Sequence, residues 1–405
     1  MTYYILIGFC LMVLLAYFFD ITSKHTKIPS VLMLIITGLA LHYISEYFDL
    51  HIPYMSRILP VMGTLGLILI VLEASLDLML IKEKSALIIR SLSSAILLFL
   101  IFTGLLTYVA VYYFDYDIKM FLINIIPISV ISSAVAIPSA VGLLQNDRDF
   151  VTYESAMSDI IGILAFDFIL LASGSFSSGV FRFIAELVLT LITSIIVSAM
   201  LAYMLHKINH HVKYVFIMTV IVLVYSLAKL IHLPSLLVVL IFGLVMNNNQ
   251  IFKNKHSEKI ISFDTFNDDL SGFKNIAAEL TFIVRSFFFL MFGFFIRLSD
   301  LFSINNLKIT VILIAIIFLL RALYFKMILQ IPLSPLFFFA PRGLITILLF
   351  LSIPSAMSLS FMNIGIVTQV IFITILMMTF GNMIFQQVEE LIQPESKEEI
   401  NNSTD

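Results

Sequence analysis

The carboxylates and hydroxyls of one short stretch, Glu154-Ser155-Ala156-Met157-Ser158-Asp159, are the residues best placed to do chemistry. They open a hydrophobic segment, and a charged side chain at membrane depth costs about 2.5–3.5 kcal/mol on insertion scales, so it usually serves ions or protons. On a helix, Ser155 and Asp159 share one face, and Glu154 and Ser158 share the next. Hard cations prefer oxygen ligands. We therefore expect Asp159 to hold a metal ion such as Na⁺, with further oxygens from Ser155 and Ser158.

The segments that carry this stretch are expected to be membrane-spanning helices. The chain of 405 residues is 60% hydrophobic and 12% charged, whereas soluble domains carry about 25% charged residues. Apolar windows long enough to cross a hydrocarbon core about 30 Å thick recur along nearly the whole sequence, so the lipid bilayer is its expected surrounding. This composition predicts an all-α membrane protein without a sizeable soluble domain. Thirteen helices are predicted, at 3–20, 29–46, 58–80, 86–114, 119–145, 154–175, 180–206, 213–231, 233–248, 275–297, 307–329, 333–354 and 362–392.

Charge and cysteine content exclude several classes of protein. The net charge of −3, without a basic face, argues against nucleic acid as a partner. The single cysteine, Cys10, excludes a disulfide framework and a cysteine-based metal site. We expect no cofactor.

Basic residues are distributed unevenly between alternate loops, which predicts the orientation of the chain. The richer loops include Lys24, Lys84 and Lys207, and the positive-inside rule makes their side cytoplasmic. The amino terminus is then outside the cell's inner membrane, and the acidic end, with a short tail at 393–405, is in the cytoplasm. The longest polar loop, about Asn247 to Asp269, is predicted to be a flexible cytoplasmic linker.

Two of the predicted helices, the fifth and the twelfth, are interrupted near their middles. The fifth contains Pro127 and Pro138, and the twelfth contains Pro341 followed by Gly343. They are seven helices apart, so they run in opposite directions, as in transporters whose inverted repeats place the substrate at paired breaks. A break exposes backbone groups that protein, water or an ion must satisfy. We expect carbonyl oxygens from Ser133 to Val135 to complete the ion's shell.

Four further charged residues are expected at depth. Arg285, Arg321 and Arg342 lie within the last predicted helices, and a buried guanidinium without an anion is costly, so each predicts a partner. The first expected pair is Glu154 with Arg321, a structural clamp rather than a transport site. Asp167 lies about 12 Å along the helix from the ion site, too far to share the ion. It is expected to pair with an arginine or to line an aqueous path.

Three short motifs follow one another along the predicted membrane region. They are Glu154-Ser155-x-x-Ser158-Asp159, Leu320-Arg321-Ala322 and Arg342-Gly343. Together they resemble the monovalent cation/proton antiporters, especially the bacterial sodium/proton exchangers of the Asn-Asp branch. The first is similar to the Glu-Ser-x-x-Asn-Asp motif of that branch, and the second to the arginine that pairs with its glutamate. The resemblance covers nearly the whole membrane region.

The resemblance implies a two-part exchanger domain over 1–392, in which the two broken helices cross. Core helices would lie within 86–175 and 307–392, and dimerisation helices of a homodimer within 1–80 and 213–297. Two departures concern the ion. Ser158 stands where the family has Asn, and Ala134-Val135-Ala136 stands where it has Thr-Asp-Pro, which removes a carboxylate.

The expected function is secondary transport, not enzymatic catalysis. Asp159 would hold either a proton or a monovalent cation, most simply Na⁺ with K⁺ or Li⁺ as alternatives, and the core would switch sides only when neutralised. Because Ser158 replaces the second acid of the Asp-Asp branch, one proton per cation is expected, so exchange is electroneutral. A K⁺/H⁺ efflux system or a cation channel of the same superfamily is the alternative. An intramembrane transferase is disfavoured because the loops are short and no His-Asp pair is present.

Overall fold

The computed structural model describes residues 2–48, 55–79, 84–171, 176–208, 210, 212–231, 233–248 and 263–401. Within these ranges all regular secondary structure is helical, as the composition predicts. The helices are α1 (Thr2–Thr26), α2 (Ser30–Tyr47), α3 (Met55–Asp77), α4 (Ser85–Phe114), α5 (Ile118–Ser129), α6 (Ser133–Ser139), α7 (Gln145–Leu171), α8 (Phe176–Lys207), α9 (Lys213–Leu230), α10 (Ser235–Asn247), α11 (Phe263–Phe295), α12 (Leu298–Leu301), α13 (Ile304–Tyr324), the π-helical turn η3 (Phe325–Leu329), the 3₁₀ turns η4 (Leu336–Phe338) and η5 (Ser355–Met357), α14 (Leu344–Leu351) and α15 (Ile364–Asn401).

The helices make the chain a multi-pass membrane protein. By length and composition, nine spans among the described residues are apolar enough to cross a bilayer. Each of the thirteen segments predicted from the sequence overlaps at least one helix of the structure. The total number of crossings stays a prediction, because several of these helices are short or carry charged residues.

Helix α7, which carries the acidic stretch, begins nine residues earlier than the sequence predicts, at Gln145 instead of 154. The charges of Asp147, Arg148 and Asp149 indicate a loop in a hydropathy reading. In the structure they lie in the first turns of α7, where carboxylates interact favourably with the helix dipole. Asp149 also forms an ion pair with Lys84, just before α4. These contacts explain why a polar segment is helical here.

The predicted linker after α10 is partly wrong, because α11 already begins at Phe263. Its first turns are amphipathic: Phe266, Leu270 and Phe273 are buried at helical spacing. The opposite face is polar, and Asp269 accepts a bond from Lys213 of α9 at 2.5 Å. Residues 249–262 lie outside the described part of the chain. At the other end, α15 continues to Asn401 rather than 392, and 402–405 lie outside the description.

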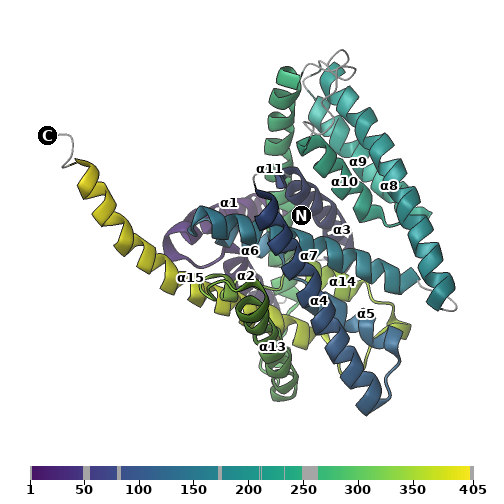
Figure 1. The fold of residues 1–405 in the computed structure, drawn as a ribbon, viewed down its shortest axis with the longest axis vertical. Helices are drawn as coiled ribbons and strands as arrows, with labels where there is room; N and C mark the ends of the chain where they lie inside the picture. The colour runs from purple at the N-terminus through teal and green to yellow at the C-terminus, as the bar shows by residue number, and fades with distance from the viewer. Residues whose placement is uncertain are drawn as a thin grey trace.

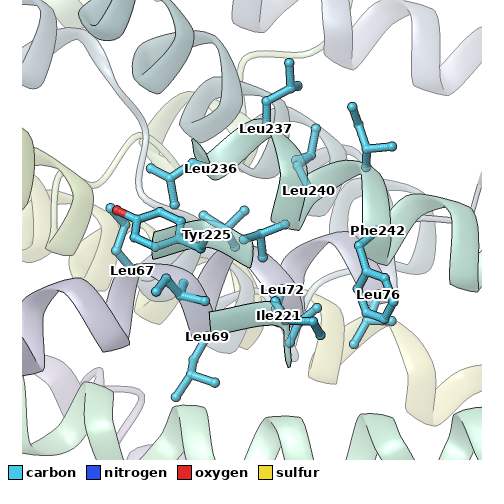
Figure 2. Packing of buried hydrophobic residues seen from close by; sticks show 14 of the residues in the cluster. Leu67, Leu69, Leu72, Leu76, Ile221, Tyr225, Leu236, Leu237, Leu240 and Phe242 are labelled. Atoms are coloured by element: carbon cyan, nitrogen blue, oxygen red, sulfur yellow. The ribbon is translucent and has the colours of Figure 1, made fainter. Parts of the chain in front are cut away.

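A large apolar cluster joins α3, α9 and α10 and fixes one side of the molecule (Figure 2). Helix α10 is apolar around its whole circumference, which is typical of a helix enclosed by protein or lipid on all sides. Figure 1 shows α8, α9 and α10 beside one another, away from α13 and α15, while the far end of α15 extends from the body. Labelled members of the cluster are Leu67, Leu69, Leu72, Leu76, Ile221, Tyr225, Leu236, Leu237, Leu240 and Phe242.

Helices α2 and α11 approach so closely that only glycine fits between them. A Cβ at Gly38 would lie 2.0 Å from the carbonyl oxygen of Leu290, and one at Gly293 would lie 2.2 Å from that of Ile35. Because the obstacle is backbone in both cases, no side-chain rotation relieves it. The helices would have to separate.

We therefore expect Gly293→Ala to destabilise the protein by about 1–3 kcal/mol, the usual cost of overpacking a core. The matched control is Gly104→Ala in α4, where a Cβ meets no atom within 4 Å. That change should be neutral or stabilising, because alanine favours the helix by up to about 1 kcal/mol. Melting temperatures of the two purified variants in detergent measure the difference. Equal melting temperatures would contradict the close approach of α2 and α11.

The two interruptions predicted in the sequence lie against each other. Between α5 and α6 the backbone is extended at 130–132, with Pro127 inside the first helix and Pro138 inside the second. Between η4 and α14 a second irregular segment covers 339–343. The amide of Ser132 in the first break donates to the carbonyl of Pro341 in the second at 2.9 Å. Helix α7 packs against both α5 and α6 and brings its acidic stretch to this junction.

Candidate functional site

Asp159 lies on α7 at the junction of the breaks, and its residue is only 4% exposed. Its Oδ2 accepts a hydrogen bond from the backbone amide of Ser133 at 3.1 Å. Ser133 is the first residue of α6, so the carboxylate lies at the amino end of a half-helix, where the free amides favour negative charge. Its Oδ1 has no hydrogen-bond partner among the described residues. One carboxylate oxygen is therefore available to a ligand.

Ser158 and Gly162 of α7 accommodate the broken backbone beside Asp159. The hydroxyl oxygen of Ser158 accepts the amide of Ile131 at 2.9 Å, which satisfies a backbone group that no helix can satisfy. One turn on, a Cβ at Gly162 would lie 2.1 Å from the side chain of Val130, so only glycine lets the break approach α7. The structure thus gives Ser158 a role in holding the break, in addition to its predicted proximity to the ion.

The hydroxyl of Ser155 donates to the carbonyl of Val151 in its own helix at 2.7 Å. Its proton is used there, while its oxygen keeps a lone pair. Ser155 is fully buried one helical turn before Asp159. This arrangement is compatible with the predicted oxygen ligand.

The carbonyl oxygens predicted to complete the ion's shell, those from Ser133 to Val135, belong to α6. The carbonyl of Val135 accepts the hydroxyl of Ser139 at 2.8 Å inside α6. Helical carbonyls point toward the carboxyl end, so α6 presents the amide of Ser133, not carbonyls of 133–135, to the carboxylate. The extended residues Val130 and Ile131 have carbonyls without a hydrogen-bond donor among the described residues. Both oxygens are therefore open to a ligand.

Sequence reasoning missed two buried hydroxyls at the same junction. Ser132 and Thr346 are fully buried, and neither hydroxyl has a partner in the described part of the chain. A Cβ at Gly343 would lie 2.7 Å from the Ser132 oxygen, so the second break packs directly on this hydroxyl. Thr346 follows in the first turn of α14. Their signal in the sequence was a hydroxyl beside each predicted break.

Glu154 and Arg321 form a bidentate ion pair between α7 and α13. The two guanidinium nitrogens of Arg321 lie 2.8 and 2.7 Å from the two carboxylate oxygens of Glu154. Each side chain is only 1% exposed. Two parallel charge-assisted bonds make this the geometry that fixes both side chains most firmly.

The ion pair continues into a larger polar network that ties four segments together. Arg321 also donates to the carbonyl of Leu336 at 2.9 and 3.1 Å and to that of Phe339 at 3.2 Å. Ser94 of α4 donates to Glu154 at 2.5 Å. The network therefore links α4, α7 and α13 to the segment leading into the second break. Ser94 was not predicted, because nothing in the sequence relates it to a glutamate sixty residues away.

Arg342 is buried at the second break, but its described partners are carbonyl oxygens instead of the predicted anion. It donates to Ile128 at 2.8 Å, to Ser129 at 3.4 Å and to Ala340 at 2.7 Å. Ile128 and Ser129 end α5, where the helix dipole is negative. The cation thus stabilises the carboxyl end of one broken helix from within the other.

Comparison with known proteins identifies the chain. Residues 10–387 match the family model described as "Sodium/hydrogen exchanger, transmembrane". The chain belongs to this sodium/hydrogen exchanger family. It is therefore a transporter that exchanges Na⁺ for H⁺, as the sequence predicts.

Solved structures confirm the fold of the exchanger. It is similar to the structure of the sodium proton antiporter MjNhaP1 from Methanocaldococcus jannaschii at pH 8, with a TM-score of 0.70 and 19% identity over 94% of this chain and 99% of that one. An electron-microscopy map of the same antiporter gives a TM-score of 0.66 and 19% identity, covering 93% and 94%. No curated protein sequence matches the exchanger.

Two other predicted residues of the exchanger lie away from the junction. Asp167 lies near Lys229 of α9, with 3.8 Å between the carboxylate and ammonium, so the prediction of an arginine partner is wrong. The lysine side chain is 57% exposed, and such partly solvated pairs contribute little to stability. Arg285 of α11 interacts through space with Glu73 of α3 and lines a cavity beside α6.

Proposed function

We propose that the exchanger moves one Na⁺ against one H⁺ by letting both compete for the carboxylate of Asp159. The observation that carries this proposal is a buried carboxylate, at the meeting point of two broken helices, with one oxygen unpartnered. A proton or a monovalent cation neutralises the same charge, so the site holds one or the other. Moving the charged carboxylate of Asp159 through the membrane interior without a bound cation or proton is costly. The core therefore switches sides only when the site is occupied.

The oxygen atoms around Oδ1 of Asp159 suit a hard cation. Those we assign to the ion are the hydroxyls of Ser132 and Ser155 and the carbonyls of Val130 and Ile131. None contributes nitrogen or sulfur, which matches the ligand preference of alkali cations. Ser158, which holds the amide of Ile131, orients this set.

Alternating access would be a movement of one group of helices against another. Contacts within the chain support two groups: α2, α3, α10 and α11 pack together, as do α4 to α7 with α13 and α15. We assign the second group as the moving core, because it contains both breaks and the Glu154–Arg321 network. The first group would form the interface of a homodimer. The loop charges support an amino terminus outside the cytoplasmic membrane and a carboxyl terminus inside.

Exchange should be electroneutral because the site offers one acid. Ser158 stands where the resembled family carries Asn, or a second acid in its Asp-Asp branch, and Val135 stands where it carries Asp. Neither serine nor valine takes up or releases a proton in exchange. One Na⁺ and one H⁺ then carry equal charge in opposite directions. Turnover moves no net charge.

Everted membrane vesicles containing the exchanger test this function directly. With the lumen acidified, Na⁺ added outside should dissipate the proton gradient, read as dequenching of an acridine dye, while choline should not. The initial rate should stay the same when valinomycin and K⁺ set the membrane potential to different values. A rate that follows the imposed potential would contradict the one-to-one stoichiometry. A response to K⁺ but not to Na⁺ or Li⁺ would reassign the cation.

A further inference from the structure

A cavity of about 510 Å³ lies between the two proposed groups of helices, and its wall includes Ala134, next to the Ser133 that donates to Asp159. Its wall is formed by the α1–α2 turn, the start of α2, helix α6 with the turn that follows it, Arg285 of α11 and Asn382 of α15. Val135 at the start of α6 belongs to this wall, and it lies two residues after the Ser133 that bonds Asp159. By the proposed orientation the cavity is on the cytoplasmic side.

The charges that line this cavity are unexpected for the entrance of a cation transporter. Lys27 and Arg285 line it, and no acidic residue does so among the described residues. Neither cation has a salt bridge within the described part of the chain. Glu73 acts on Arg285 through space, but the two form no ion pair among the described residues and Glu73 does not line the cavity. The wall is therefore positive, and a cation gains nothing from it.

Two helices begin at the same wall, with their amino ends at Ser30 of α2 and Gln145 of α7. The first backbone amides of a helix have no partner within the helix, and together with the dipole they favour anions. No side chain caps α2: its N-cap residue is Pro29, which makes no side-chain hydrogen bond. The amides at Ser30 are thus left for a ligand or water.

An independent observation on α15 also indicates a ligand. Asn382 is only 4% exposed and lines the cavity, and its Oδ1 has no partner among the described residues. Its Nδ2 donates to the carbonyl of Ser139 at 3.0 Å, which fixes the orientation of the amide. A buried amide oxygen left without a donor is costly. A protonated phosphate oxygen would supply that donor, as would a water molecule that accompanies the ligand.

We propose that this cavity binds a phosphate-bearing anion, held by Lys27 and Arg285 on one side and by the amide of Asn382 on the other. Helix amino ends, a lysine and an arginine together are the groups with which proteins bind phosphate. The cations belong to α11 and the α1–α2 turn, whereas Ser139 and Asn382 belong to the proposed core. A bound anion therefore bridges the two groups and slows exchange, an effect that rests on the proposed alternating movement.

Binding is tested on the purified full-length exchanger in phospholipid-free detergent. Inorganic phosphate, titrated at constant ionic strength with chloride as the balancing anion, should bind with a measurable heat in isothermal titration calorimetry. Arg285→Gln and Lys27→Gln should each raise the dissociation constant at least about tenfold, as expected for loss of one charge-assisted contact. The matched control is Arg90→Gln, because Arg90 lines another cavity whose wall also contains Asp147 and Asp149. Absence of binding, or equal weakening by the control, overturns the site.

A second arm distinguishes a free phosphate from a lipid head group. Nanodiscs of phosphatidylcholine alone should still bind inorganic phosphate, and replacing a fifth of the lipid with phosphatidic acid should leave that binding unchanged if the ligand is soluble. Competition by phosphatidic acid assigns the same phosphate chemistry to a lipid.

Regulation is measured separately, as uptake of radioactive Na⁺ into everted vesicles. Phosphate buffers the pH changes that a dye would report, so the dye assay is unsuitable here. Phosphate on the cytoplasmic face should reduce the wild-type rate at least about twofold, and Arg285→Gln should remove that sensitivity when each variant is compared with and without phosphate. Calorimetric binding in a chain that shows no exchange would defeat the proposed function and leave the site standing. Normal exchange with bound phosphate and an unchanged rate would overturn the bridging role.

Discussion

Replacing Asp159 with asparagine is expected to reduce Na⁺/H⁺ exchange to the background of vesicles without the protein. Asparagine has the same shape, and its amide oxygen can still accept the bond from Ser133, so the junction of the breaks should keep its geometry. It has no charge for Na⁺ and no site for a transported proton. The measurement is Na⁺-driven dequenching in everted vesicles, normalised to the amount of exchanger present.

Asp167→Asn is the matched control, because it makes the same chemical change two turns further along α7. Among the described residues the ion-pair partner of Asp167 is a partly exposed lysine, with 3.8 Å between the charged groups, and Asp167 lies outside the junction. Exchange by this variant should stay within about a factor of two of the wild type, since solvated pairs of this kind contribute at most about 1 kcal/mol. Equal loss of exchange in both variants would show that the two acids are equally required and that Asp159 has no special role.

Ion binding separates a dead transporter from an unfolded one. Na⁺ that binds only the folded state stabilises it by about 2.7 kcal/mol when its concentration is one hundred times the dissociation constant. The melting temperature of the wild type in detergent should therefore rise with Na⁺. The melting temperature of Asp159→Asn should start at least as high, because no buried charge remains at position 159, and it should not respond to Na⁺. A retained Na⁺ response would move the binding site elsewhere.

The sequence predicted the elements of the site better than their contacts. Hydropathy located most helices within a few residues, but it missed helical charged segments, as at Gln145 and Phe263, and it predicted one helix over 333–354 where α14 covers only Leu344–Leu351. Proline and glycine indicated both breaks because they weaken a regular helix, although Pro127 and Pro138 themselves lie inside α5 and α6. The acidic stretch was readable because carboxylates in an apolar segment have few explanations other than transport.

Contacts between distant segments could not be read from spacing. The cost of a buried guanidinium predicted a partner for Arg321, and Glu154 was the first expected, but nothing suggested Ser94 or the Leu336 carbonyl, which complete the network. Which backbone group faces Asp159 depends on where α6 begins, and a shift of a few residues exchanges carbonyls for amides. The pairing of Asp167 with Lys229 was not predicted, although lysines near helix ends, such as this one in the last turn of α9, reach neighbouring carboxylates.

Glu154→Gln and Arg321→Gln are each expected to lower the stability of the exchanger far more than substitutions at its surface or in its loops. Removing one member of a buried ion pair leaves the other charge without compensation, at a cost of about 3–5 kcal/mol. Arg321 should be the more damaging position, because its loss also strands the carbonyls of Leu336 and Phe339. Apparent melting temperature in detergent, with size-exclusion profiles to confirm monodispersity, measures both variants.

The double variant decides whether the two residues act as a clamp. If the main penalty is an uncompensated charge, Glu154→Gln combined with Arg321→Gln should be more stable than the sum of the single losses by about 0.5–3 kcal/mol, the range found for directly interacting pairs. The same cycle on Asp167→Asn and Lys229→Gln, the partly exposed pair, should show almost no coupling. Additive losses at Glu154 and Arg321 would mean that each stabilises the core through its other contacts. The double variant should also exchange Na⁺ more slowly than the wild type without losing its Na⁺-dependent stabilisation, because the clamp aligns the helices around the ion and does not touch it.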